Sequence, residues 1–446
     1  MNRNNCIHKA AGDALVLFAA LIIMPCLLTA SCQKSARVAE QADGWCELGL
    51  ASGNTATGLG PMDYYAGYNG FVAAAKPGER VVFHAQFPKA RYCSVMVYDE
   101  HFLLLDSILD RDIVPLAGVN PFIPGTDRGG KYLGEFEIRV LMEPKPQGPR
   151  PPNTLYAGLT HDGKPNHTAI IGYRVYMQDQ GYGYQDHNPL AVYGGVPAPH
   201  FRVLDKAGNP FCPSPTLART LTTRANADML WQNRETLKDP TLGMSDLANP
   251  PVWYNNASRE EQSSLSFVPA PDTSYIMMPV SSRFGELLVF RWKAPRVPAD
   301  TFYGKPFPED GVDMRYWSLS FDYVNLKRWE KVFCERTVAD IEVPVLPGGA
   351  SQVVVGFNGM ARPEAVPPEQ WVGLERSDYL VVVRDIVVNP DYPGLFWNQP
   401  AGDVTAQMDR YTPGGVYCSA AEFAQDPDLG LRRKELLGKI EGTADR

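Results

Sequence analysis

Four arginines are the first candidates for chemistry, because they recur in two segments of the chain that resemble each other. Arg91 and Arg315 begin apolar segments, and Arg174 and Arg384 lie within apolar segments. A guanidinium that enters an apolar layer needs a carboxylate or carbonyl partner. One interpretation is a binding site for an anionic or polyhydroxylated ligand, and the alternative is a structural ion pair with a nearby acid. The acids considered for such a pair are Asp99, Asp179 and Asp385. Recurrence favours the structural alternative, because one fold used twice needs the same ion pair twice.

Aromatic side chains are the second group of candidates. Tyr182 and Tyr184 lie in a Tyr/Gly-rich stretch of the first segment, whereas the tryptophans of interest all lie in the second. Those tryptophans are Trp292, Trp317, Trp329, Trp371 and Trp397. Exposed Tyr and Trp side chains stack against sugar rings or a protein partner, although they also complete small cores. A carbohydrate ligand is therefore the leading expectation, with Tyr182, Tyr184 and the four arginines as candidate ligand-binding residues.

Signatures of the common catalytic families are missing. The sequence holds no H-E-x-x-H, G-x-S-x-G or G-x-x-x-x-G-K-[ST] pattern, and no Rossmann glycine pattern follows a predicted strand. The histidines from His84 to His200 match no standard ligand spacing, so we predict no metal and no cofactor. A glycan hydrolase or lyase stays open as an alternative, because carboxylate pairs leave no regular spacing. Its candidate acids are Asp99, Asp179 and Asp186.

The formal net charge of −8, from 42 basic and 50 acidic residues, argues against nucleic-acid binding. With 44% hydrophobic residues, the chain can bury a sizeable core.

An internal repeat organises these residues. Residues 78–83 align with 285–290, and residues 91–95 align with 315–319. Asp63 and Asp272 each open an aromatic segment upstream, and the offset between the copies changes only in Pro/Gly-rich loops. Chance matching of short patterns is the alternative. Two diverged copies of one domain explain the pattern better, since loops absorb insertions.

Each copy is predicted to consist of short strands. Val81, Phe83 and Ala85 alternate with polar residues, which is the period of a half-buried strand. Close turn signals favour antiparallel sandwiches over βαβ units. We therefore expect a mainly β protein with sandwich domains at 45–213 and 272–420. A partly helical connector is expected at 214–271, and a C-terminal tail at 421–446.

The N-terminus has the features of an export signal. An apolar stretch from Ala14 to Leu28 follows basic residues and is short for a membrane span. It leads into small residues and Cys32, a pattern similar to the bacterial lipobox. We predict that 1–31 is a lipoprotein-type signal peptide and that Cys32 is lipidated; ordinary cleavage near Ala30 is the alternative. The predicted location is the outer membrane or a periplasm-facing membrane if the host is Gram-negative, with the lipid anchor as the membrane contact.

The cysteines outside the leader suggest two disulfide bonds. Cys46 begins the first copy and Cys212 ends it, and Cys334 and Cys418 are placed for a second bond, although other connectivities are open. The fifth, Cys93, lies mid-strand on an apolar face and is predicted to be a buried thiol.

Several segments carry a family resemblance. They are Tyr173 to Gly181, Gly194 to Pro197, Leu288 to Pro295 and Tyr411 to Cys418, together with the Arg-Tyr-x-Ser segments at Arg91 and Arg315. In these pieces the chain resembles uncharacterised exported bacterial proteins related to the domains of unknown function 1214 and 1254. The resemblance implies jelly-roll-like β-sandwiches and no established activity.

Together these patterns predict a cell-envelope lipoprotein that binds a carbohydrate or another envelope component without catalysis. The alternatives are the glycan hydrolase or lyase and a structural envelope spacer. The sequence does not indicate an oligomeric state.

Overall fold

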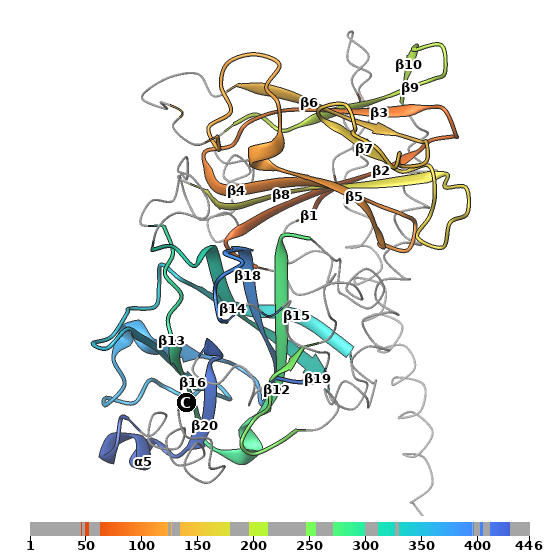
Figure 1. Ribbon diagram of the computed structural model, residues 1–446. Coiled ribbons are helices and arrows are strands. Elements are labelled where there is room, and N and C mark those ends of the chain that lie inside the picture. The colour runs from red at the N-terminus through yellow and green to blue at the C-terminus, as the bar shows by residue number, and fades with distance from the viewer. Residues whose placement is uncertain are drawn as a thin grey trace, which may run out of the picture.

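The fold consists of two β-sandwiches, shown in Figure 1 as a computed structural model, with the first sandwich above the second. The structure describes Cys46 and residues 50–52, 63–123, 126, 134–178, 196–212, 247–255, 271–298, 311–325, 330–394, 396, 402–404 and 411–428.

The first sandwich pairs two five-stranded sheets. One sheet has the order β1 (Leu50–Ser52), β2 (Ala66–Ala74), β8 (Thr168–Gln178), β4 (Ala90–Tyr98) and β5 (Leu104–Leu109). The other has the order β10 (Pro210–Phe211), β9 (His200–Leu204), β3 (Arg80–Gln86), β6 (Glu135–Leu141) and β7 (Thr154–Tyr156).

The second sandwich has a six-stranded and a four-stranded sheet. The six-stranded sheet has the order β15 (Glu330–Ala339), β14 (Met314–Asn325), β18 (Asp378–Val388), β12 (Thr273–Ser281), β11 (Tyr254–Asn255) and β19 (Gly402–Asp403). The four-stranded sheet has the order β17 (Trp371–Gly373), β16 (Ala350–Gly356), β13 (Leu287–Lys293) and β20 (Gly414–Cys418), and the short helix α5 (Ala420–Gln425) follows it.

The two sandwiches share strand order and register. In the first, Ser94 of β4 lies opposite Arg174 of β8; in the second, Ser318 of β14 lies opposite Arg384 of β18. These four residues are the ones that the sequence repeat makes equivalent. The mainly β, antiparallel sandwich architecture predicted from the sequence is therefore confirmed.

Two details were not expected. Each sandwich contains one parallel pair, β6 with β7 and β16 with β17, among its antiparallel strands. Strand β11 lies within the 214–271 segment that we expected to be connector, yet it pairs with β12 and extends the sheet of the second sandwich. Residues 213–246, where the helical pattern was expected, lie outside the described residues.

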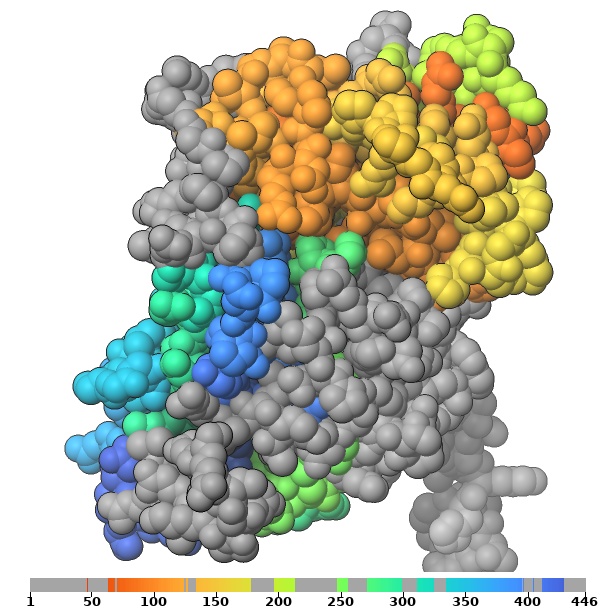
Figure 2. All heavy atoms as spheres, viewed as in Figure 1, coloured from red at the N-terminus to blue at the C-terminus, as the bar shows by residue number. Residues whose placement is uncertain are grey.

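Each sandwich has its own core between its sheets. Val81, Phe83 and Ala85 of β3 are buried in the first core, as their alternation predicts. The second core is richer in tryptophan and contains Trp253, Trp292 and Trp317. A separate apolar cluster joins the sandwiches, and it includes Tyr92 and Tyr176 from the first and Tyr316 and Ile386 from the second. In Figure 2 the orange part of the first sandwich accordingly lies directly on blue and green atoms of the second.

Candidate functional site

The four arginines singled out in the sequence all lie at the junction of the sandwiches. Each binds a carboxylate of the other sandwich, and each is at most 5% exposed. The N···O distances are 2.6 Å for Arg91–Asp340, 2.7 Å for Arg315–Asp110, 3.0 Å for Arg174–Asp272 and 2.7 Å for Arg384–Asp63. The junction is thus crossed by four buried ion pairs.

These pairs are reciprocal. Asp63 and Asp272 are equivalent in the repeat, and each binds the repeat-equivalent arginine of the other sandwich. Asp110 and Asp340 are likewise equivalent, because each directly follows the strand residue paired with Ser94 or Ser318. In the interface of a symmetric dimer, each residue pair occurs twice with the subunits exchanged, as these pairs do here. The chain therefore carries an internal pseudo-dimer interface.

Burial shifts the ionisation of these carboxyls. It raises the pKa of Asp340 to about 6, although the guanidinium of Arg91 acts in the opposite direction. It also raises the pKa of Asp110, against the attraction of Arg315. Because the cost of desolvating both partners offsets much of their attraction, intact buried pairs of this kind add little net stability, although breaking one is costly.

The arginines therefore form structural ion pairs, but their partners are not the acids that we expected from the sequence. They face carboxylates rather than an open ligand site. Asp99 instead accepts backbone N–H groups of His101 and Leu103. Asp179 and Asp186, together with the candidate ligand residues Tyr182 and Tyr184, lie outside the described residues.

One of the two expected disulfides is present. Cys46 and Cys212 are bonded, which ties the ends of the first sandwich together. The predicted Cys334–Cys418 bond is wrong, because both residues are buried cysteines outside any disulfide. Cys334 lies in β15 of one sheet, whereas Cys418 packs with Leu287 and Phe423 beside α5 on the other sheet. Cys93 is a buried thiol, as predicted.

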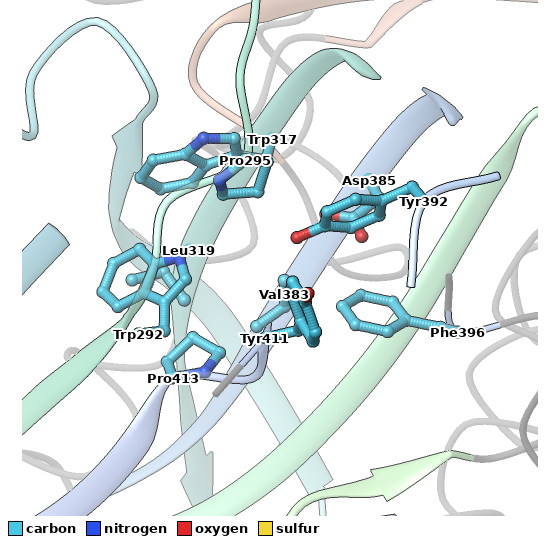
Figure 3. A pocket seen from close by; sticks show the side chains of 10 residues that line it. All are labelled: Trp292, Pro295, Trp317, Leu319, Val383, Asp385, Tyr392, Phe396, Tyr411 and Pro413. Atoms are coloured by element: carbon cyan, nitrogen blue, oxygen red, sulfur yellow. The ribbon is translucent and has the colours of Figure 1, made fainter. Parts of the chain in front are cut away.

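A pocket in the second sandwich is the best candidate for a functional site. Its walls come from β13, β14 and β18 and from the segments around residues 392–396 and 411–413. Its empty space, counted together with the open solvent at its mouth, is about 260 Å³. Figure 3 shows the side chains that line it: Trp292, Pro295, Trp317, Leu319, Val383, Asp385, Tyr392, Phe396, Tyr411 and Pro413. Five of these ten are aromatic, so ring faces and edges form most of the wall.

The rings are fixed against one another. Trp292 and Trp317 meet edge to face with centroids 5.3 Å apart, and Tyr392 and Tyr411 do the same at 5.5 Å. Edge-to-face pairs are a favoured aromatic geometry, so the walls are organised before any ligand arrives.

Two polar groups enter this aromatic pocket. The Asp385 side chain lies at its edge and is 2% exposed, and no hydrogen bond or charge among the described residues offsets its desolvation. Tyr392 is 6% exposed, and its buried hydroxyl has no hydrogen-bond partner in the described part of the chain and points into the pocket (Figure 3). Burial raises the pKa of Asp385 well above its ordinary value, since no cation offsets the desolvation of the carboxylate.

The first sandwich shows that the fold does not require this acid. Asp385 lies opposite Trp317, and the equivalent pair in the first sandwich is Val175 opposite Cys93. Val175 and Cys93 are buried members of an apolar core. The second sandwich has therefore placed a carboxyl and an indole where its sister copy has small apolar side chains.

Other kinds of site have less support. Within the described ranges, no group of three or more His, Cys, Asp or Glu side chains could hold a metal ion. No helix in that part of the chain combines the length and hydropathy needed to cross a bilayer.

Comparison with known proteins supports the fold alone. No family model matches the chain, and no curated protein matches it. The structure is similar to an uncharacterized protein from Burkholderia cenocepacia, with a TM-score of 0.50 and 14% identity, covering 86% of this chain and 85% of that one. A protein from Vibrio parahaemolyticus aligns with a TM-score of 0.38 and 12% identity over 77% of this chain and 89% of its own.

Proposed function

We propose that this chain is a non-catalytic binding protein of the cell envelope and that its ligand occupies the aromatic pocket of the second sandwich. The observation that carries the proposal is the carboxyl of Asp385, which is 2% exposed and has no cation that offsets its desolvation, beside the hydroxyl of Tyr392, which is buried without a hydrogen-bond partner among the described residues. Polar groups withdrawn from water without partners destabilise a fold. A ligand that satisfies both groups accounts for their presence.

The composition of the pocket favours binding over hydrolysis. Glycosidases place two carboxyl groups about 5–10 Å apart on either side of the scissile bond. Asp385 is the single acid among the residues that line this pocket. One acid within aromatic walls suits the orientation of a ligand better than acid–base cleavage.

The envelope location rests on the N-terminal pattern. The apolar stretch before Cys32 and the small residues around it are typical of an exported lipoprotein. The Cys46–Cys212 disulfide is in keeping with an oxidising compartment.

The test is a binding screen of the full-length chain, purified in mild detergent, against mono- and oligosaccharides, amino sugars and polar lipid headgroups. Binding is followed by tryptophan fluorescence, to which Trp292 and Trp317 of the pocket wall contribute, and products are analysed in the same samples. We expect binding without turnover, weakened in Asp385→Asn and retained in Asp391→Asn, which removes an exposed acid close to Tyr392. Turnover, or binding that Asp385→Asn leaves intact, would contradict the proposal.

A further inference from the structure

The chemistry of the pocket walls narrows the class of ligand, on the assumption that the pocket is the binding site proposed above. Aromatic rings carry negative potential on their faces, and a carboxylate adds a full negative charge. Trp292, Trp317, Tyr392, Phe396 and Tyr411 all contribute rings to the same small space as Asp385. The aromatic rings and the carboxyl all attract positive charge, and the fold brings them together from separate segments of the chain.

No protein cation neutralises Asp385 within the described part of the chain. Arg296 lies near this end of the sandwich, but it binds Asp313 at 2.8 Å. Arg384, the sequence neighbour of Asp385, points to the opposite face of β18 and binds Asp63. The carboxyl of Asp385 is therefore left for a group that the protein does not supply.

One wall residue already attracts a cation. The ammonium of Lys293 lies 5.4 Å from the centroid of the Tyr411 ring. This is the distance range of a cation–π contact. The ring thus presents a face of the electrostatic character that a bound cation needs.

We propose that the pocket binds an organic cation, specifically a methylated ammonium group, held by the aromatic walls and the carboxyl of Asp385. Methyl groups on nitrogen pack against ring faces, and the spread positive charge is attracted by the rings and the acid together. A sugar, by contrast, presents several hydroxyls around its ring. Apart from the indole N–H groups, the pocket offers it only the carboxyl of Asp385 and the hydroxyls of Tyr392 and Tyr411 among the lining side chains.

Binding of a cation has a consequence for protons. Burial raises the pKa of Asp385, so the empty pocket favours the neutral carboxyl, while a cation beside it favours the carboxylate. The titratable groups that face Asp385 are the hydroxyls of Tyr392 and Tyr411 and, beyond Tyr392, the carboxylate of Asp313. Burial raises the pKa of Tyr392, so this phenol stays neutral near pH 7. We therefore expect a proton to leave Asp385 on binding and affinity to rise with pH.

The experiment compares two ligands of the same shape. Choline carries the charge, and 3,3-dimethylbutan-1-ol is its neutral carbon analogue. Both are titrated into the full-length chain by calorimetry in buffers of different ionisation enthalpy, and tetramethylammonium serves as the minimal probe. We expect choline to bind at least about tenfold more tightly than the neutral analogue, with proton release at pH 7. Asp385→Asn should remove the preference for charge and the proton release, and Asp391→Asn should keep both.

The outcomes separate this inference from the proposed function. Equal binding of choline and its neutral analogue would overturn the cation inference and leave a binding pocket in place. Binding of sugars with no binding of choline would do the same. If nothing in either panel changes the fluorescence or heat of the wild type, the proposed function falls together with the inference.

Discussion

Removing the Asp63 carboxylate should destabilise both sandwiches, because Asp63 belongs to the first sandwich and its carboxylate binds residues of the second. One oxygen of Asp63 accepts hydrogen bonds from Arg384, Tyr316 and Ser318, each at 2.7 Å. Asp63→Ala leaves a guanidinium and two hydroxyls without that acceptor at a buried junction. Breaking a buried ion pair by deleting one partner costs about 3–5 kcal/mol, and each lost neutral hydrogen bond about 1 kcal/mol more. We therefore expect Asp63→Ala to lower the free energy of unfolding by about 5 kcal/mol.

The repeat supplies a matched control. Asp272 is the equivalent residue, but its side chain accepts a hydrogen bond from Arg174 at 3.0 Å through one oxygen, and its other oxygen has no partner among the described residues. Asp272→Ala should therefore cost less, about 3 kcal/mol. In a third variant, Asp63→Ala combined with Arg384→Met removes both charges and should recover about 2 kcal/mol relative to Asp63→Ala.

Urea denaturation of the full-length chain, followed by tryptophan fluorescence and by far-ultraviolet circular dichroism, measures these differences. A cost below about 1 kcal/mol for Asp63→Ala would refute the reasoning, since breaking a buried pair should cost more. A double variant less stable than Asp63→Ala would refute it as well, because the unpaired guanidinium would then not be the source of the instability.

The remaining predictions concern other parts of the chain. Burial raises the pKa of Asp385 above its unfolded value near 4, so the stability that this group contributes is present below about pH 4 and is lost as the pH rises through the folded pKa. In urea denaturation, Asp385→Asn should therefore gain stability over the wild type from about pH 4.5 to about pH 8. A stability difference that does not change with pH would contradict this. Cys46→Ser should lower the unfolding free energy by about 3–5 kcal/mol, while Cys93 should react with thiol reagents only after unfolding; rapid labelling of Cys93 in the native protein would contradict its burial. Cys32→Ser should abolish incorporation of labelled fatty acid in the expressing cell, and unchanged incorporation would exclude Cys32 as the lipidated residue.

The fold could be predicted from the sequence for two reasons. The alternation of apolar and polar residues is visible within each strand, and the repeat is visible when two segments of the chain are aligned. The equivalence of Arg91 with Arg315, and of Arg174 with Arg384, could be read from the sequence and is reproduced by the strand register. The partners of these arginines were not accessible, because they are set by docking of the sandwiches. Arg384 and Asp63 are 321 positions apart in the chain. The one indication in the sequence was that Asp63 and Asp272 align with each other, as the acids of two reciprocal ion pairs must.

The sequence suggests Asp385 as an ion-pair partner for the arginines, but the structure places it in a different environment. Adjacent residues of a strand point to opposite faces of the sheet, so Asp385 turns into the sandwich core while Arg384 turns toward the junction. The alignment with Val175 carried the better signal, namely an acid that replaces a core residue. The Cys334–Cys418 bond failed for a related reason, because sequence position did not reveal that the two strands belong to different sheets.

The most direct test of the binding pocket is a crystal structure of the chain with a ligand from the binding screen. We predict that the ligand lies between the Trp317 and Tyr392 rings and contacts the carboxyl of Asp385 and the hydroxyl of Tyr392. A ligand bound at residues 181–195, or a water molecule alone bridging Asp385 and Tyr392, would contradict the assignment of the pocket as the binding site.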